Sequence, residues 1–136
     1  MQDPFVGTWK LNVERSEFDA NHRPTAGTMV FELDAQGHYV MTAEGRNEKG
    51  EKVAERPTRF IPDGKEYPIA DFPGLKNVHT RPDPNTIADE ARREDGSVVG
   101  GGTYIVSADG KSLTATTSGW DSQLRQFKLR TMWDRQ

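Results

Sequence analysis

Apolar and polar residues alternate in short stretches along most of the chain. In the first stretch, Phe5, Trp9 and Leu11 fall on one side of an extended backbone, and Thr8 and Lys10 fall on the other. A period of two is typical of a β-strand that buries one face, and no stretch keeps a helical period over three turns. The pattern therefore predicts an all-β chain of about nine or ten strands. Beyond the first strand, the others are expected at 29–33, 39–43, 51–61, 75–81, 85–93, 97–107, 111–119 and 124–133.

Turn signals separate most of these strands. Asp-Gly pairs, for example at 95–96 and 109–110, supply the positive φ that tight hairpin turns require. Two connections are longer: residues 14–25, and the proline-containing segment 62–74 with at most a short strand around Tyr67. Short connections between successive strands predict an antiparallel meander.

A meander of this length has two open edges unless it closes on itself. The predicted fold is therefore a single antiparallel up-and-down β-barrel of about 8–10 strands with an internal cavity. Residues 1–136 are expected to form one domain. Gly100, Gly101 and Gly102 lie inside a predicted strand, where glycines usually mark a bulge or a sharp bend of the sheet.

Composition narrows the function classes. The chain has 136 residues, only 33% hydrophobic residues, a net charge of −3 and no cysteine. Low hydrophobicity fits strands whose outer face is polar, and the absence of cysteine excludes disulfides and thiol chemistry. The acidic balance and the lack of a long apolar run argue against nucleic acid and membrane as partners. The expected location is cytoplasmic for the chain as given, or periplasmic or secreted if a signal peptide was removed.

The segment from Phe5 to Leu11, which reads FVGTWKL, resembles the first strand of the calycin superfamily, the lipocalins and fatty-acid-binding proteins. The wider pattern, with GKEYPI and ADGKSLT, resembles small bacterial lipocalin-like proteins of mostly unassigned function. The resemblance implies a barrel with a ligand cavity, closed at one end by Trp9. It also implies an arginine of the last strand over that ring, for which Arg130 and Arg125 are the candidates. The chain lacks the helix-turn-helix that follows the first strand of fatty-acid-binding proteins.

One possible catalytic pair lies in the hairpin formed by 75–81 and 85–93. If the register centres on Pro84, His79 lies directly opposite Asp89. Opposed residues have Cβ atoms about 4.5–5.5 Å apart, so an imidazole–carboxylate hydrogen bond is within reach. On the interior face, such a pair can act as a general acid or base, whereas a one-residue slip turns both side chains into solvent.

Two function classes follow. The first is a protein that binds a small, partly apolar, aromatic or terpenoid-sized molecule inside the barrel. The alternative is a cofactor-independent lyase or isomerase with His79 as base and Asp89 as its orienting partner. Tyr39, Tyr104 and Arg130 are candidates to bind the ligand or a developing oxyanion, and Trp120 is a candidate for the cavity mouth.

Neither a metal nor a cofactor is predicted. The histidines, His22, His38 and His79, show no metal-ligand spacing, and the chain has no nucleotide-binding fingerprint. A barrel with a filled interior and no ligand is a third interpretation. The sequence leaves open whether the protein is a monomer or a homodimer.

Overall fold

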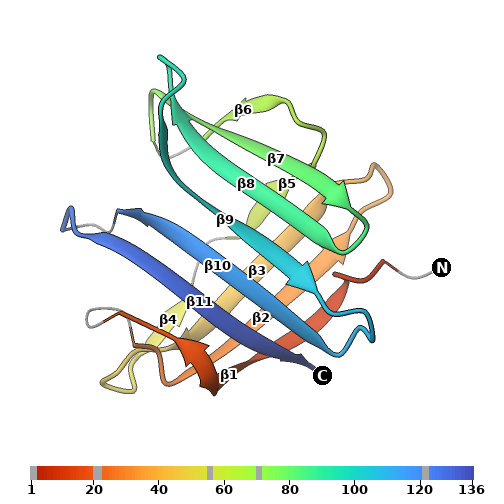
Figure 1. The fold of residues 1–136 in the computed structure, drawn as a ribbon, viewed down its shortest axis with the longest axis vertical. Coiled ribbons are helices and arrows are strands. Elements are labelled where there is room, and N and C mark those ends of the chain that lie inside the picture. The colour runs from red at the N-terminus through yellow and green to blue at the C-terminus, as the bar shows by residue number, and fades with distance from the viewer. Residues whose placement is uncertain (1–2, 20–22, 55–56, 70–71, 121–122) are drawn as a thin grey trace.

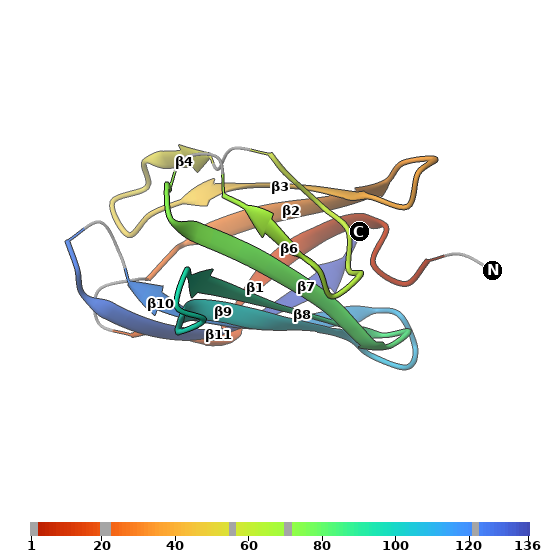
Figure 2. The ribbon, with the colours of Figure 1, turned by 90° about the horizontal axis from the view of Figure 1, so that it is seen from above.

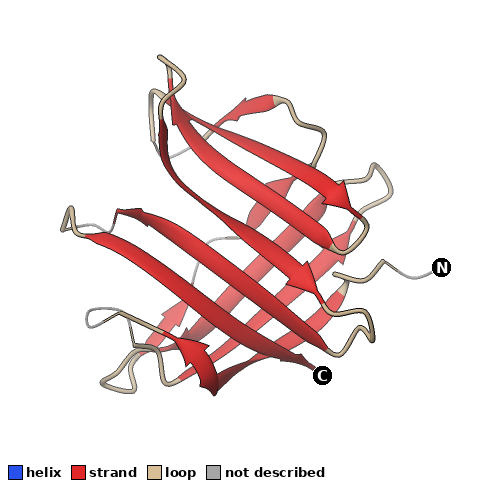
Figure 3. Cartoon of the chain, viewed as in Figure 1, coloured by secondary structure: helices blue, strands red, loops and turns tan. Residues whose placement is uncertain are grey.

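The fold consists of strands and the turns between them. The computed structural model describes residues 3–19, 23–54, 57–69, 72–120 and 123–136. Within these ranges there is no helix, and so none that is long and apolar enough to span a membrane (Figure 3). The strands are β1 (Gly7–Glu17), β2 (Ala26–Leu33), β3 (Tyr39–Arg46), β4 (Lys52–Ala54), β5 (Thr58–Phe60), β6 (Glu66–Pro68), β7 (Leu75–Asp83), β8 (Thr86–Arg93), β9 (Val98–Val106), β10 (Ser112–Trp120) and β11 (Gln126–Arg135).

All of these strands belong to one antiparallel sheet. The order is β4-β3-β2-β1-β11-β10-β9-β8-β7-β6, and β5 pairs with β3 (Figure 1). Apart from the β1–β11 pair, in which Leu11 lies opposite Trp133, neighbours along this path follow one another in the chain. Seen from above, β2 and β3 lie opposite β9, β10 and β11 (Figure 2). The predicted all-β, up-and-down barrel architecture is confirmed.

Side chains join the two ends of the sheet. In the described residues, no backbone ladder connects β3 or β5 to β6 or β7. The Phe60 ring stacks on the His79 ring with centroids 4.2 Å apart, and the Arg81 Nη1 donates a hydrogen bond of 2.6 Å to the Tyr39 hydroxyl. The Gly64 N–H also donates to the His79 carbonyl over 2.9 Å. We call this junction between β3/β5 and β7 the seam.

Large apolar side chains fill the end of the barrel near the N-terminus. Their alternation along each strand points them inward, as expected for a sheet that buries one face. Phe5 packs edge-on against Phe31 with ring centroids 5.9 Å apart, and Trp9 is completely buried. The remaining members of this cluster are Met29, Tyr39, Ile87, Val106, Leu113 and Ala115. This end is therefore packed solid.

Arg135, rather than Arg130 or Arg125, covers the Trp9 ring. Its guanidinium carbon lies 4.2 Å from the ring centroid, and its Nε donates to the Gly110 carbonyl over 2.6 Å. The reason is the β1–β11 register, which places Trp9 directly opposite Arg135. Arg130 and Arg125 are exposed, so the prediction that one of them fills this role was wrong.

A glycine is required where the chain passes under Arg135. The φ of Gly7 is +139°, and a Cβ at this position would lie 2.6 Å from the Arg135 Nη1. That nitrogen donates to the Val6 carbonyl over 2.8 Å. The Gly7-Thr8-Trp9 segment thus provides both the ring and the space for the arginine that covers it.

Removing this arginine should destabilise the barrel. Arg135→Ala is expected to lower the free energy of unfolding by about 2 kcal/mol, because the cation–π contact and charge-assisted hydrogen bonds to backbone carbonyls are lost. Urea unfolding at pH 7.5 measures the difference. Arg130→Ala, on the same strand but exposed, should stay within about 0.5 kcal/mol of the parent protein. Equal losses in the two variants would contradict this assignment.

Three details differ from the expected strands or refine them. β1 continues to Glu17, with a bulge after Asn12, instead of ending at residue 13. The expected strand at 51–61 is instead two short strands, β4 and β5, which both pair with β3. The bulge predicted at the glycine run is confirmed, because the β8–β9 register shifts between Ala91 and Arg92, opposite Gly100.

Candidate functional site

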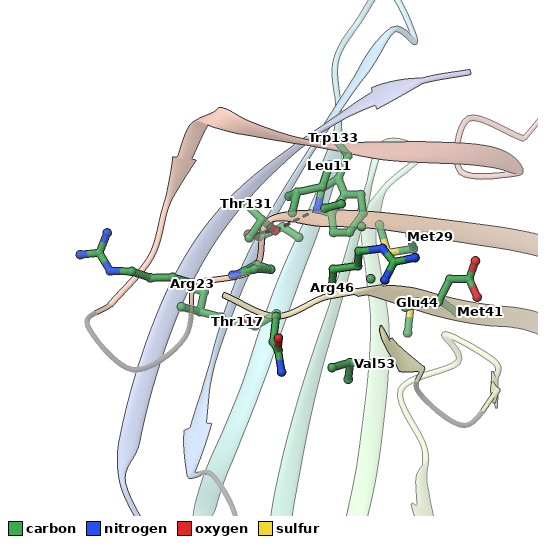
Figure 4. A pocket seen from close by; sticks show the side chains of 18 of the residues that line it. Leu11, Arg23, Met29, Met41, Glu44, Arg46, Val53, Thr117, Thr131 and Trp133 are labelled. Atoms are coloured by element: carbon green, nitrogen blue, oxygen red, sulfur yellow. Dashed lines mark hydrogen bonds between the residues drawn. The ribbon is translucent and has the colours of Figure 1, made fainter. Parts of the chain in front are cut away.

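The half of the barrel away from the buried Trp9 is hollow. A cavity of about 460 Å³, here called the main cavity, lies between β1–β3 and β9–β11 (Figure 4). Its wall is formed by inward-pointing residues of several strands, including Leu11, Met29, Met41, Tyr104, Leu129 and Trp133. Its lining also includes residues at the start of β2 and at the end of β3 and the turn that follows it, within 23–27 and 43–48. The interior of the barrel is therefore part core and part cavity.

Polar groups in the deeper wall already have partners. The Trp133 Nε1 donates a hydrogen bond of 2.9 Å to the Thr131 Oγ1, as the dashed line in Figure 4 shows. The Thr131 hydroxyl in turn donates to the Ala115 carbonyl over 3.3 Å. A ligand that contacts this wall therefore meets mainly apolar surface.

Charged side chains stand at the mouth of the main cavity. Arg23, Glu44, Arg46 and Glu48 all contribute to its lining. Glu44 pairs with the Lys52 ammonium at 3.6 Å, and the Arg46 Nη1 donates to the Gly50 carbonyl over 2.9 Å. Because both signs of charge are present, the mouth has no strong preference for an anion or a cation.

The residues predicted from the sequence to bind the ligand do not all lie at the main cavity. Tyr104 lines the main cavity, whereas Tyr39, Trp120 and Arg130 do not. Tyr39 packs in the core, where burial and its hydrogen bond to the Asp3 carboxylate raise the pKa of its phenol. Trp120 is 53% exposed, and Arg130 is exposed on β11. These positions follow from which face of each strand a residue occupies, and Tyr39 lies at the packed end.

A second hollow of about 640 Å³ lies against β8, β9 and β10, where the glycine run leaves little side-chain volume. Asp89, Glu90, Ser118 and Trp120 contribute to its lining. It is more polar than the main cavity, and the two have no lining residue in common. Trp120 is thus at this hollow and not at the mouth of the main cavity, and Asp89 is among the residues that line the hollow.

The predicted register of the β7–β8 hairpin is confirmed, since His79 pairs with Asp89. His79 is only 8% exposed and lies in the seam, stacked on Phe60. Burial lowers the pKa of His79 to about 4, and the Asp63 carboxylate partly offsets this. The imidazole is therefore neutral at pH 7 and contacts the seam, not the main cavity.

Asp89 is half-buried on the same face of the sheet, and its carboxyl group lies toward β9, away from the Phe60 ring. A Cβ on Gly102 would be 3.3 Å from the Asp89 Oδ1, so the carboxyl lies over this glycine. Burial raises the pKa of Asp89 to about 6, against the opposing effect of the Gly102 N–H. In the part of the chain that the structure describes, no hydrogen bond or ion pair joins His79 to Asp89. The catalytic role of this pair stays a prediction that no contact in the structure favours.

Of the other two histidines, only His38 is among the described residues. The His38 Nδ1 lies 3.9 Å from the Asp34 carboxylate, and His22 lies outside the described residues. Among the residues that are described, no three His, Asp or Glu side chains gather as metal ligands would.

Sequence reasoning missed the residues that form the wall of the main cavity. Leu129 and Trp133 alternate with polar residues along β11, but alternation does not distinguish a packed interior from a hollow one. The available signal was the small residues among these positions, such as Ala43 and Ala115, which both line the cavity.

Comparison with known proteins identifies the class of fold. No family model and no curated protein matches the sequence. Among solved structures, the fluorescent protein UnaG matches with a TM-score of 0.65 and 15% identity over 100% of both chains. As-p18, an extracellular fatty acid binding protein, matches with a TM-score of 0.58 and 19% identity over 98% of this chain and 97% of its own. Zebrafish ileal bile acid-binding protein, complexed with cholic acid, gives a TM-score of 0.60 and 13% identity over 98% and 99%.

These structural matches, at such low sequence identity, establish likeness of fold alone. The chain forms an antiparallel barrel with the same fold as these three structures. The match extends over nearly the full length of each chain. The fold expected from the FVGTWKL segment is confirmed.

Proposed function

We propose that this protein binds one small, largely apolar molecule in the main cavity. The supporting observation is an internal space of about 460 Å³ behind a charged mouth, with a wall of aliphatic, methionine and aromatic side chains. Ligand pockets typically measure about 300–1,000 Å³ and bury most of the ligand surface. A barrel built only for stability would fill this space with side chains.

The wall favours a compact or aromatic ligand. Trp133 and Tyr104 offer aromatic surface, while Met29 and Met41 supply flexible side chains that adapt to irregular shapes. The names of similar structures point to the same use of a barrel interior, since As-p18 binds fatty acids and the zebrafish protein was solved with cholic acid. The proposed ligand class is therefore an aromatic or terpenoid-sized molecule.

The test uses the uncharged fluorescent probe N-phenyl-1-naphthylamine. We expect saturable binding at one equivalent, with the enhanced and blue-shifted emission that an apolar site produces. Trp133→Ala should weaken the affinity about tenfold, because one aromatic wall is removed. Trp120→Ala makes the same change outside the main cavity and should leave the affinity within about twofold. Absence of saturable binding, or equal losses in both variants, would argue against the proposed site.

A further inference from the structure

Asp89 belongs to a row of paired residues that runs along the inner face of the sheet, from β8 to β11. Directly paired residues of adjacent strands lie on the same face of a sheet. Asp89 pairs with Gly102, Gly102 pairs with Thr117, and Thr117 pairs with Leu129. Thr117 and Leu129 line the main cavity. The Asp89 side chain therefore lies on the same face as the cavity wall, two strands away from Thr117.

Gly102 removes the side chain that would separate Asp89 from this wall. A Cβ on Gly102 would lie 3.3 Å from the Asp89 Oδ1 and 3.2 Å from the Thr117 Cγ2. Both atoms thus approach the same point, from opposite sides of the glycine. Any bulkier residue at 102 would also press on the Thr116 carbonyl, which is only 2.8 Å from that Cβ position. The glycine therefore leaves no side chain between Asp89 and Thr117, and Thr117 belongs to the lining of the main cavity.

Among the residues that the structure describes, no cationic side chain balances this carboxyl group. In the described parts of the chain, Asp89 forms no ion pair with lysine, arginine or histidine. Of the titratable groups around it, His79 on β7 stacks on Phe60, and Tyr104 lies on the same face of β9. Glu90, the next residue on β8, bonds the Arg92 guanidinium at 2.8 Å. Asp89 is half-buried, so a cation bound beside it from outside the chain would gain a charge-assisted hydrogen bond that the described residues do not provide.

We propose that the ligand of the main cavity carries a basic nitrogen and that Asp89 binds the ammonium group through the gap above Gly102. This inference rests on the proposed function and specifies its ligand class as an apolar amine. The apolar part of the ligand lies against Trp133 and Met29, and the ammonium lies beside Thr117. An ammonium donates hydrogen bonds and supplies the positive charge that the described residues around Asp89 lack.

Three decyl compounds with different head groups test this assignment. Decylamine, 1-decanol and decanoic acid compete with N-phenyl-1-naphthylamine for the intact protein at pH 7.5. We expect decylamine to displace the probe at a concentration about tenfold or more below that of 1-decanol, with decanoate the weakest. In Asp89→Asn, the preference for the amine should fall to within about twofold, while the affinity for the uncharged probe is retained and shows that the barrel is intact.

A pH series on the unaltered protein gives a second measurement that needs no variant. The preference for decylamine over 1-decanol should decline as the pH falls from 7.5 to 5, because the Asp89 carboxylate, with a pKa of about 6, becomes protonated. His79, Tyr104 and Glu90 are the neighbouring titratable groups. Of these, the pKa of His79 is about 4, so the imidazole stays neutral over most of this range.

Glu90→Gln is the matched control, since it removes the same charge one residue further along β8, on the opposite face. It should keep the amine preference. Equal displacement by amine and alcohol in the parent protein, or a loss of preference in Glu90→Gln and not in Asp89→Asn, overturns this inference alone. Failure of the probe and of all three decyl compounds to bind overturns the proposed function, and this inference with it.

Discussion

Asp89→Asn is expected to make the barrel more stable at pH 7.5, by about 2–3 kcal/mol. The folded protein holds the pKa of Asp89 at about 6, above the ordinary value of 3.8, because the carboxyl group is buried. Ionising it in the folded state therefore costs more than in the unfolded chain. An amide keeps the shape of the side chain without the charge, and so removes this cost.

The pH dependence identifies the source of the gain. Because the folded pKa of Asp89 is raised, its stabilising contribution is complete below pH 3.8 and is lost as the pH rises through 6. The contribution of His79 to stability changes with pH in the opposite direction, since its folded pKa of about 4 lies below the ordinary value of 6.5. Its contribution is complete above pH 6.5 and is lost as the pH falls through 4. The two effects oppose each other between pH 4 and 6.

Urea unfolding at half-unit steps from pH 4 to 7.5 checks this result. The stability of the parent protein should change little over the range from pH 4 to 6. That of Asp89→Asn should rise by about 3 kcal/mol between pH 4 and 6.5, because only the His79 effect remains. Asp95→Asn is a control of opposite sign, since hydrogen bonds from Ser97 lower the pKa of Asp95 and the substitution should destabilise. A less stable Asp89→Asn at pH 7.5 would contradict the assignment.

Filling the main cavity should abolish ligand binding. Ala43→Phe places a ring on the inward face of β3, where Ala43 lines the cavity and pairs with Met29. We expect the affinity for N-phenyl-1-naphthylamine to fall at least about thirtyfold, because the ring occupies the space of the ligand. Titration of the probe by fluorescence measures the change, and the thermal unfolding midpoint shows whether the variant folds.

Val40→Phe gives a comparison within the same strand. Val40 lies on the outer face of β3, opposite Glu32, and does not line the main cavity. The added ring should leave probe binding unchanged within about twofold. If Ala43→Phe binds the probe as well as the parent protein does, the ligand site is elsewhere, and the second hollow becomes the first place to examine.

The sequence predicted the register of paired strands correctly where the two strands are close in sequence, and wrongly where they are far apart. The pairing of His79 with Asp89 was correct because a short hairpin turn sets the register of the strands that it joins. The arginine over Trp9 was misassigned because β1 and β11 pair across almost the whole chain. No turn specifies that register, and several arginines near the C-terminus fit the pattern equally well.

Alternation, turn residues and the FVGTWKL segment therefore determined the all-β class, the meander and most strand positions, since these depend on neighbours in the chain. The tertiary structure alone decided which inward positions are packed and which surround a cavity, because that depends on side chains from distant strands. It also decided the directions of His79 and Asp89. Phe60 from β5 holds the imidazole in the seam, and the absent side chain of Gly102 on β9 leaves room for the carboxyl group next to Thr117.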